Sequence, residues 1–380
     1  MENKKKPAIR FKGFCDAWEQ RKLGDVFEEY SEKNHPDLPP LTIIQGGGTI
    51  RRDESERALQ YDKASLFNYK MVNVDDFIVH LRSFEGGLEK ANSKGIISPA
   101  YHTFHGENID SRFYYAYFHS KEFINKDLKP HVYGIRDGRS IDIEGMKTIR
   151  IPYTSYKEQR TIGDFLEHLD HLITLHQRKL EKLQLVKKSM LEKMFPKNGS
   201  KIPEIRFEGF ADDWEQRKLG EVTQKFKSGN SLKADKISES GAYPVYGGNG
   251  LRGYTSTYNH EGEFALIGRQ GALCGNMNYF IGKAYFTEHA VAVEADENNN
   301  TRFMYYMLDT MNLGQYSDQS AQPGLAVNKL IKLENMFPKK EEQIKIENYF
   351  QSIDHLITLH QSKLKSLKFI YTFFLGNSVS

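Results

Sequence analysis

Arginine, lysine, asparagine and glutamine side chains gather among glycines in two turn-rich stretches, residues 27–152 and 223–338. Arginine and lysine can donate hydrogen bonds to the edge of guanine, and asparagine and glutamine can pair with adenine. Other such side chains meet phosphates, which position a protein on DNA without specifying a sequence. Taken one at a time, most of these residues could simply be exposed to solvent on a loop. Because they cluster on glycine-rich loops, together they favour a role in ligand recognition.

The candidates for DNA contact are the polar and aromatic residues of these turns. In the first stretch they are Gln45, Arg51, Arg52, Arg82, Ser83, Lys90, Lys94, Tyr101, Arg136 and Arg139. In the second stretch they are Lys233, Asn249, Arg252, Tyr254, Arg269, Gln270, Asn276, Gln319 and Gln322. Because the two sets differ in residue type, a DNA target that both stretches read would be asymmetric.

No motif for catalysis stands out in the chain. A phosphate-binding loop is excluded at Gly282-Lys283 because the next residue is Ala284 rather than serine or threonine. Pro39-Pro40 lies in Leu-Pro-Pro-Leu, which lacks the Asn/Asp-Pro-Pro-aromatic pattern of amino-methyltransferases. No cysteine and histidine spacing suits zinc. We therefore expect no catalytic and no metal-binding residues, with an active site dispersed among the His, Asp and Glu residues as the alternative.

Two duplicated segments define the architecture. The segment 170–177 recurs unchanged at 354–361, and 11 of 14 positions match when both copies are extended to Leu183 and Leu367. A start module, residues 9–26, matches residues 205–222 at 14 of 18 positions. The chain is thus a start module, a variable region and a long helix, followed by the same three parts again.

Both long helices carry apolar residues at alternating steps of three and four, which is a heptad seam. Such a seam is buried only against a partner helix, and the two copies offer each other that partner. Histidine in the seam could bind metal or sense pH, but a polar residue that sets helix register is the simpler interpretation. The predicted seam and subunit-interface residues are Leu169, Ile173, His176, Leu180 and Leu183 in the first helix, and Ile353, Ile357, His360, Leu364 and Leu367 in the second.

The predicted fold class is α+β. It consists of two α/β domains, which the resemblance described below implies are target recognition domains, separated by a long antiparallel two-helix coiled coil with an internal pseudo-twofold repeat. Each variable region ends at a proline followed by Glu-Gln, and Ser155-x-x-Glu158 predicts a capping box at the first helix start. The expected domains are residues 1–153, the first helix at 154–197, residues 198–338, and the second helix at 339–380. The clearest internal elements are expected at 41–44, 76–80, 112–118, 243–246, 264–267, 290–293 and 302–308.

Composition narrows the class of protein further. Lys+Arg 53 against Asp+Glu 50 gives a net charge of only +3, so any basic surface must be local. Two cysteines at unmatched positions in the halves favour reduced thiols over a disulfide framework. No apolar run approaches the roughly 20 residues that span a membrane. We therefore expect a cytoplasmic protein with no membrane partner.

The duplicated residues resemble those of a known family. Trp-Glu-Gln-Arg-Lys-Leu-Gly at 18–24 and 214–220, the Glu-Gln helix entries and the Asp-x-x-Ile-x-Leu-His-Gln-x-Lys-Leu helices resemble the specificity subunit of type I restriction–modification systems. The resemblance covers nearly the whole chain in this order. Residues 243–250 and 266–272 look like a recurrent type of target recognition domain, and residues 86–90 and 96–101 are looser matches.

The resemblance implies a division of labour. Two recognition domains each read one half of a split site on double-stranded DNA, and the antiparallel helices set the spacing between the halves. Two modification subunits dock on the helices and methylate adenine with S-adenosylmethionine. Restriction subunits add ATP-driven and Mg-dependent translocation and cleavage. By this resemblance the chain is a DNA-binding, non-catalytic subunit, and it binds none of these cofactors itself.

Two alternatives come from other classes of protein. One is a stand-alone DNA methyltransferase or nuclease, which would act without partner subunits. The other is a coiled-coil adaptor whose globular units bind proteins. Salt-dependent DNA binding in the presence of partner subunits separates the adaptor from a DNA-binding subunit.

Overall fold

The computed structural model describes residues 7–55, 63–134, 139–197, 199–271, 273–317 and 324–378. The chain divides into two compact units. The first unit comprises residues 1–177 and 362–380, and the second comprises residues 178–361. Each unit contains one variable region together with a part of each long helix, because both helices run from one unit into the other.

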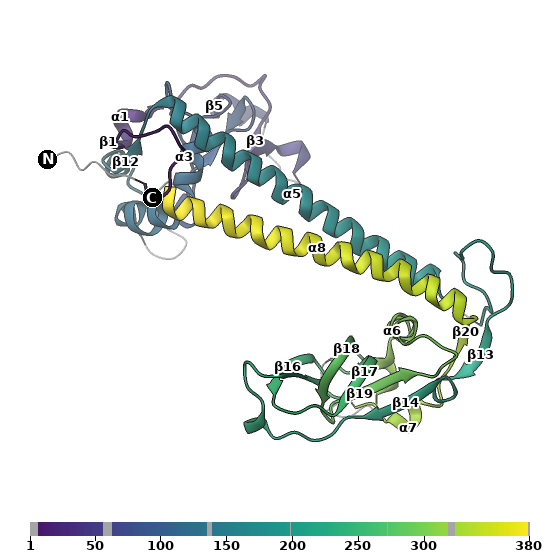
Figure 1. Ribbon diagram of the computed structural model, residues 1–380. Coiled ribbons are helices and arrows are strands. Elements are labelled where there is room, and N and C mark those ends of the chain that lie inside the picture. Colours follow the sequence, from purple (N-terminus) through teal and green to yellow (C-terminus); the bar gives the residue numbers. More distant parts are fainter. Residues whose placement is uncertain are drawn as a thin grey trace. The chain divides into compact units, whose positions relative to one another are not determined.

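The first unit is built around a four-stranded antiparallel sheet with strand order β2-β9-β6-β7. Helix α3 packs between this sheet and the start of α5 (Figure 1), and buried aromatic rings meet edge to face in the interface. The elements that form this unit's sheet, hairpins and longer helices are β1 (Glu19–Lys22), β2 (Glu28–Tyr30), β3 (Leu41–Ile44), β4 (Gly48–Arg51), β5 (Lys70–Val72), β6 (Phe77–Val79), α2 (Ser83–Gly86), β7 (Glu89–Lys90), β8 (Gly95–Ile97), β9 (His102–His105), α3 (Ser111–Phe118), β12 (Arg150–Tyr153) and α5 (Tyr156–Lys193).

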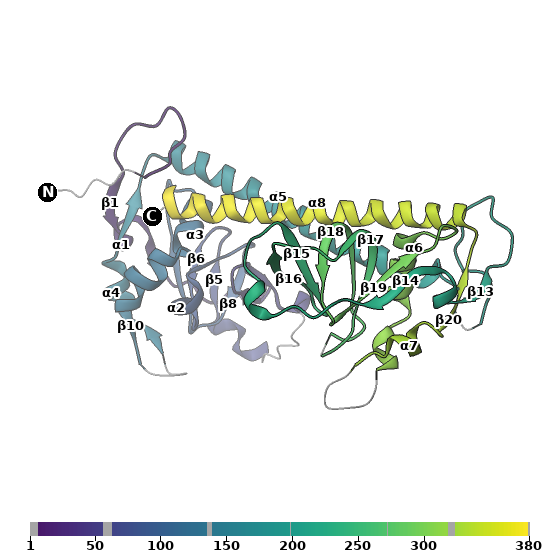
Figure 2. The ribbon, with the colours of Figure 1, turned by 60° about the horizontal axis from the view of Figure 1, so that its bottom comes forward.

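The second unit contains a six-stranded sheet of order β14-β19-β17-β18-β15-β16, whose strands lie side by side in Figure 2. Helix α6 packs between this sheet and α8, as α3 does in the first unit. The bounds are β13 (Glu215–Lys218), β14 (Thr223–Ser228), β15 (Tyr243–Gly247), β16 (Gly250–Thr255), β17 (His260–Gly268), β18 (Met277–Phe286), β19 (Ala290–Ala295), α6 (Thr301–Thr310), β20 (Glu334–Phe337) and α8 (Lys340–Ser378). All the internal elements expected from the sequence are confirmed.

The four central strands of the two variable regions share one topology, although the sequences align only weakly and the hairpin β15–β16 joins its sheet whereas β3–β4 forms a separate one. The order β2-β9-β6-β7 in the first unit corresponds to β14-β19-β17-β18 in the second. In both, a hairpin follows the first of these strands, and a helix follows β9 or β19.

The second repeat also has the spacing Gly248-x-Gly250-x-x-Gly253, but these glycines lie in the β15–β16 hairpin rather than in a strand-to-helix turn. That position excludes a dinucleotide-binding loop.

The long helices α5 and α8 run antiparallel. In the first unit, the rings of Phe165 and Phe374 lie 4.7 Å apart. In the second unit, the Lys187 ammonium lies 2.6 Å from the Asp354 carboxylate, and Phe195 stacks on Phe350. An early residue of α5, Phe165, thus meets a late residue of α8, whereas a late residue of α5, Lys187, meets an earlier residue of α8, which confirms the predicted antiparallel direction.

The predicted heptad seam agrees with the burial pattern of both helices. Leu169 and Ile353 are buried, and the other eight predicted seam residues are intermediate in exposure among mostly exposed neighbours. Helix α8 continues to Ser378, slightly beyond the end near Leu375 that the sequence suggests. The alternation of steps of three and four therefore identified the contact face correctly in both repeats.

Each start module is held to its long helix by a buried glutamate. Arg10 donates two hydrogen bonds to Glu158, at 2.6 and 2.7 Å, and Trp18 Nε1 donates a third at 3.1 Å. In the second repeat, Arg206 donates two hydrogen bonds of 2.8 Å to Glu342. Strands β1 and β13 of the start modules pair with β12 and β20, directly before each helix. The duplicated start-module residues therefore build the joint between a recognition domain and its helix.

The glutamine after each of these glutamates holds the domain's own helix. Gln159 Nε2 donates to the carbonyl oxygen of Thr154, and its Oε1 accepts from the backbone N–H of Asp110 at the start of α3. Gln343 does the same for the carbonyl of Pro338 and the N–H of Asn300 at the start of α6. One side chain thus links the beginnings of two helices in each repeat.

These contacts correct two sequence-based interpretations of the helix starts. Pro338 is the counterpart of Thr154, whereas Pro152 lies inside β12 opposite Gln20, so the two prolines are not equivalent. The capping box is only half formed. The Glu158 N–H donates to the Ser155 hydroxyl, but the Glu158 carboxylate turns to the start module.

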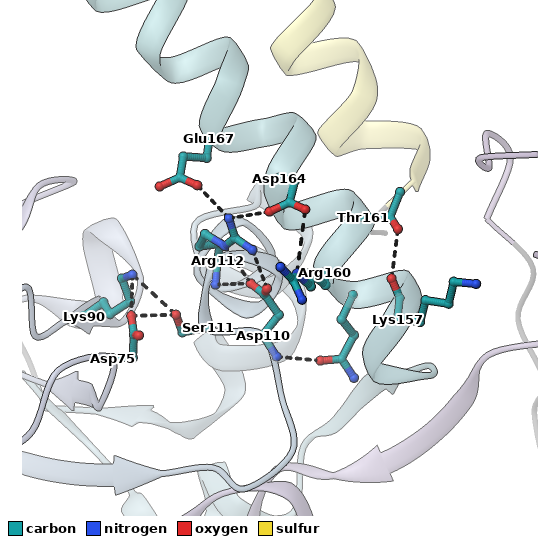
Figure 3. Close-up of polar contacts among 11 residues, drawn as sticks. Asp75, Lys90, Asp110, Ser111, Arg112, Lys157, Arg160, Thr161, Asp164 and Glu167 are labelled. Carbon is teal, nitrogen blue, oxygen red and sulfur yellow. Dashed lines mark hydrogen bonds and ion pairs between the residues drawn. The ribbon is translucent and has the colours of Figure 1, made fainter.

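An arginine network joins α3 to α5 in the first unit. Arg112 contacts Asp110 at 2.7 Å, and it reaches Asp164 and Glu167 of α5 at 2.7 and 2.6 Å (Figure 3). Gly163 leaves the room for this arrangement, because a Cβ there would lie 2.7 Å from Asp110 Oδ1. The close approach of α3 and α5 depends on a residue without a side chain.

In the second unit, different residues form the equivalent contact between α6 and α8. Asn300 and Glu347 occupy the positions of Asp110 and Gly163, and Asn300 Nδ2 donates to the Glu347 carboxylate at 3.0 Å. Asp110 thus lies opposite a glycine, which avoids a second carboxylate at this place, whereas Asn300 lies opposite a glutamate that accepts its hydrogen bond. The two substitutions compensate each other.

A buried carboxylate holds the glycine turn between β3 and β4. Glu89 accepts hydrogen bonds from the N–H groups of Gly46 and Gly48, at 2.6 and 2.9 Å, and from the Tyr115 hydroxyl. Both glycines have φ near +73°, a conformation that favours glycine. Burial acts to raise the pKa of Glu89, but the hydrogen bonds from His119, Gly46 and Gly48 outweigh it and lower that pKa. Glu89 is therefore ionised, and its carboxylate holds the backbone of the β3–β4 turn in place.

The compensating pair in the α3–α5 contact predicts a double-mutant rescue. Gly163→Glu places a second carboxylate against Asp110, and we expect it to destabilise the chain by about 1–3 kcal/mol through crowding and repulsion. Asp110→Asn in the same chain recreates the Asn300–Glu347 pair and should recover more than half of that loss. Urea unfolding of the two single variants and the double variant measures both effects. Additive destabilisation in the double variant would contradict the compensation.

The lowered pKa of Glu89 predicts a pH dependence. Its contribution to stability is fully present above the unfolded-state pKa of about 4.3 and is lost as the pH falls through the folded-state value. We expect Glu89→Gln to cost about 1–3 kcal/mol at pH 7 and less at pH 4. Denaturant midpoints at the two pH values test this, with the exposed Glu85→Gln as control. An equal loss at both pH values would show that the charge of Glu89 is not involved.

Candidate nucleic-acid interface

In the first unit, the β3–β4 turn lies against the segment that follows β6. A Cβ on Gly86 in α2 would fall 2.1 Å from Gln45 Nε2, so the Gln45 side chain lies directly over that helix. Arg82 follows β6, and its guanidinium is 68% exposed. Arg82 pairs with Glu85 at 2.7 Å, but an exposed pair of this kind is worth less than about 1 kcal/mol. Gln45 therefore lies over α2, Arg82 precedes the same helix, and both side chains remain accessible to a ligand.

In the second unit, the β15–β16 turn lies against the segment that follows β17. A Cβ on Gly248 would lie 3.1 Å from the carbonyl oxygen of His289 and 3.4 Å from that of Gln270. The Arg252 side chain crosses Gly247, where an added Cβ would fall 2.6 Å from Arg252 Cδ. Gln270 Oε1 lies 2.8 Å from His289 Nδ1. Residues far apart in the sequence thus meet at one place.

These two places correspond in the shared topology. Strand β6 matches β17 in the sheet order, and the β3–β4 hairpin matches the β15–β16 hairpin in chain order. Each hairpin turn presents an exposed amide side chain, Gln45 or Asn249, beside an arginine that follows the central strand, Arg82 or Arg269. We call Gln45 and Arg82 the first reading surface. The second reading surface consists of Asn249, Arg252, Arg269 and Gln270.

Several first-unit candidates have structural roles instead. Ser83 is fully buried, and its hydroxyl accepts from the N–H of His80, so it cannot meet DNA directly in this conformation. Lys90 Nζ lies 2.7 Å from Asp75 and donates to Ser111 (Figure 3). Arg52 donates to the carbonyl of Leu41 and to a tyrosine hydroxyl. Each of these three side chains thus forms hydrogen bonds within the fold, and their contact with DNA stays a prediction.

The remaining first-unit candidates lie at the surface or near it. Arg51 pairs with Asp53 at 2.7 Å, and Lys94 is exposed. Arg139 is exposed and lies 5.6 Å from the ring of Phe84 in α2. Tyr101 is half-buried, and burial raises the pKa of its hydroxyl. Arg139 and Tyr101 both lie beside the segment that carries Arg82, since the Tyr101 ring lies 6.1 Å from the ring of His80.

The second-unit candidates divide in the same way. Arg269 Nε donates to the carbonyl of Leu325 at 3.2 Å, so its guanidinium is partly occupied. Tyr254 is half-buried in β16 and its backbone pairs with Ser238. The exposed candidates are Lys233, Asn249, Arg252, Gln270 and Asn276. The candidates Arg136, Gln319 and Gln322 lie outside the described residues.

The loop after β6 is held rigid by a buried histidine. His80 Nδ1 accepts from the N–H of Arg82 at 3.3 Å, while the His80 N–H donates to Ser83. Burial lowers the pKa of His80, which keeps the ring neutral at physiological pH. The neutral ring can accept this hydrogen bond, and it fixes the backbone from which Arg82 projects.

Two exposed apolar residues and one histidine were not anticipated from the sequence. Leu81 is 65% exposed beside Arg82, and Ile44 is 41% exposed beside Gln45. Apolar side chains at such positions can contact the methyl group of thymine. His289 was missed because its partner Gln270 lies on another strand. An apolar residue next to an expected DNA-contacting residue is the signal that could have identified Leu81 and Ile44.

The described residues show no other obvious chemistry. Among them, no group of three or more His, Cys, Asp or Glu side chains could hold a metal ion. No helix in the same residues is long and apolar enough to cross a membrane. The reading surfaces are therefore the best-supported sites for binding a partner.

Known proteins similar to this chain have one description in common. The family model of the type I restriction modification DNA specificity domain matches residues 16–185 and 211–368. The EcoprrI specificity subunit of Escherichia coli is 46% identical over 145 residues, which are 37% of this chain and 36% of that protein, so the match spans about a third of the relative's length. The MjaVIII specificity subunit of Methanocaldococcus jannaschii is 23% identical and covers 93% of this chain and 90% of that protein.

A solved structure has the same fold. The S subunit of a type I restriction–modification system from M. genitalium superposes with a TM-score of 0.69 at 18% identity, covering 98% of this chain and 99% of that chain. The family model matches both repeats, and in each repeat it includes the start-module strand, the recognition region and most of the long helix. The chain belongs to the family of DNA specificity subunits of type I restriction–modification systems.

Proposed function

We propose that this chain reads a bipartite, asymmetric target on double-stranded DNA and catalyses no reaction itself. The observation that carries the proposal is the pair of reading surfaces, which occupy the same place in the shared topology but present different side chains. Equal placement suits two halves of one duplex, as in twofold DNA-binding proteins. Unequal side chains make the two half-sites different. Gln45 and Arg82 serve the first half-site, and Asn249, Arg252 and Gln270 serve the second.

The partners in this proposal are two modification subunits and the restriction subunits. Leu175 and Leu359 hold the same position in the two helix repeats, and they are 38% and 39% exposed. A repeated apolar position on each helix suits two copies of one partner, since each copy meets an equivalent surface. S-adenosylmethionine, ATP and Mg²⁺ belong to those partner subunits. The adenine methylation and DNA cleavage are theirs as well.

The alternatives are tested on the isolated chain. A stand-alone methyltransferase or nuclease would modify or cut DNA when supplied with S-adenosylmethionine or Mg²⁺ alone, whereas we expect no activity without partner subunits. A protein-binding adaptor would show no salt-dependent binding to target DNA after assembly with the modification subunits. Either result would overturn the proposed function.

The two reading surfaces predict separable specificity. Arg252→Ala or Gln270→Ala should relax the second half-site by about 1–3 kcal/mol per lost base contact and leave the first unchanged. Gln45→Ala and Arg82→Ala are the matched variants, with the opposite expectation. Methylome sequencing of cells that carry each variant with its partner subunits reads both half-sites at once. Equal weakening of both half-sites would indicate phosphate contacts or a folding defect.

The long helices predict control of the spacer between half-sites. Deleting one heptad from each helix, residues 176–182 and 360–366, preserves the seam and shortens each helix by about 10 Å. That length corresponds to about three base pairs of duplex. We expect a shorter spacer with unchanged half-site sequences, measured by the same methylome sequencing. A deletion of seven residues from α5 alone breaks the register and serves as the control that abolishes methylation.

A further inference from the structure

A histidine holds the amide of Gln270 at the second reading surface. Gln270 is exposed, and its Oε1 lies 2.8 Å from His289 Nδ1. The two residues come from different parts of the sheet, since Gln270 follows β17 and His289 lies between β18 and β19. Among the described residues, this contact is the only side-chain hydrogen bond to Gln270, so His289 is the described side chain that orients the amide.

The backbone around His289 is itself firmly placed. The N–H of Arg269 donates to the carbonyl oxygen of His289 at 2.9 Å, which ties the β18–β19 loop to the end of β17. Gly248 of the hairpin turn lies against the same carbonyl. The next residue, Ala290, is buried at the start of β19. The imidazole therefore projects from a firmly placed backbone toward the exposed Gln270 side chain.

This contact determines which group of Gln270 faces a ligand. When His289 Nδ1 carries its proton, it donates to Gln270 Oε1, and the amide NH₂ group turns outward. An outward NH₂ group donates to acceptors on a base edge, such as N7 of a purine. The remaining lone pair on Oε1 can still accept from the amino group of adenine. Glu288 is the carboxylate nearest to the ring, with Oε1 3.5 Å from His289 Nε2.

Fixing the amide before binding reduces the entropy lost on binding. A free glutamine loses rotamer freedom when it is ordered at an interface, at a cost of about 0.5–1.5 kcal/mol. In the first unit, Gln45 is restrained differently, because it packs over Gly86. Both amides are thus held, one by packing and one by a hydrogen bond.

We propose that His289 is a positioning residue for the second half-site, orienting the Gln270 amide so that it distinguishes one base pair. The inference rests on the proposed function, because it assumes that the second reading surface meets DNA. His289 acts through Gln270 and does not itself need to touch the base. No other histidine has this role in the described part of the first reading surface.

Three substitutions of His289 separate positioning from structural support. Asparagine can place its amide near the position of Nδ1, glutamine near that of Nε2, and alanine removes both. His289→Asn should therefore preserve the contact with Gln270, while His289→Gln and His289→Ala should lose it. Gln270→Ala is the reference for complete loss of the contact. The complex of this chain with its modification subunits is assembled with each variant, and its recognition sequence is determined by methylome sequencing.

The readout is competition binding with duplexes that change one base pair of the second half-site at a time. We expect His289→Ala to reduce discrimination about 3- to 10-fold at the position where Gln270→Ala has its effect. His289→Gln should behave like His289→Ala, and His289→Asn should lie within about twofold of the unchanged protein. Discrimination at the first half-site should stay constant throughout.

Each other outcome overturns the inference in a distinguishable way. If Gln270→Ala alters one position and His289→Ala does not, Gln270 reads DNA without help from His289. If all three His289 variants weaken both half-sites together, His289 supports the fold. If Gln270→Ala changes nothing but Arg252→Ala relaxes the second half-site, the inference fails while the proposed function stands. If no variant at the second reading surface affects that half-site, the proposed function fails at that surface too.

Discussion

A buried carboxylate one turn into each long helix is the contact on which the rest of the structure depends. Glu158 and Glu342 are almost completely inaccessible, and each receives a bidentate arginine from its start module. Such an ion pair contributes little net stability compared with apolar packing. Removing one partner, however, leaves a buried charge unpaired, at a cost of about 3–5 kcal/mol. The main effect of the arginine–glutamate pair is on geometry, because it fixes the position of the start module on the helix. The glutamine beside each carboxylate then fixes α3 or α6.

Both repeats retain this ion pair between the start module and the long helix. The residues around the ion pair differ between the repeats. Asp110 faces Gly163 in one repeat, and Asn300 faces Glu347 in the other. In the first repeat Trp18 donates to the glutamate, whereas the buried Trp214 Nε1 has no partner among the described residues. At the contact between Asp110 or Asn300 and the long helix, the side chains on both sides differ between the repeats, while the tryptophan and the glutamate are the same in both. A recognition domain moved onto the other helix would need its matching helix residue as well.

Much of this arrangement could be predicted from sequence because it is periodic or repeated. The heptad spacing gave the contact face of α5 and α8, and the duplication gave the order of the parts. Roles that depend on distant partners could not be predicted. Arg52 and Lys90 carry the polar groups expected of DNA contacts, yet Arg52 donates to the carbonyl of Leu41 and Lys90 pairs with Asp75. The shared role of Thr154 and Pro338, whose carbonyl oxygens accept from Gln159 and Gln343, is visible in the hydrogen bonds of the structure.

The structure separates the residues that hold the reading surfaces from those that face outward. Glu89 accepts the N–H groups of the β3–β4 turn, and His80 with Ser83 fixes the loop before α2, so neither task falls to Gln45 or Arg82. In the second unit, backbone pairing between Arg269 and His289 supports the loop that carries Gln270. Outward side chains can then change without loss of the fold. That independence explains how one topology can present a glutamine and arginine in one unit and a different set in the other.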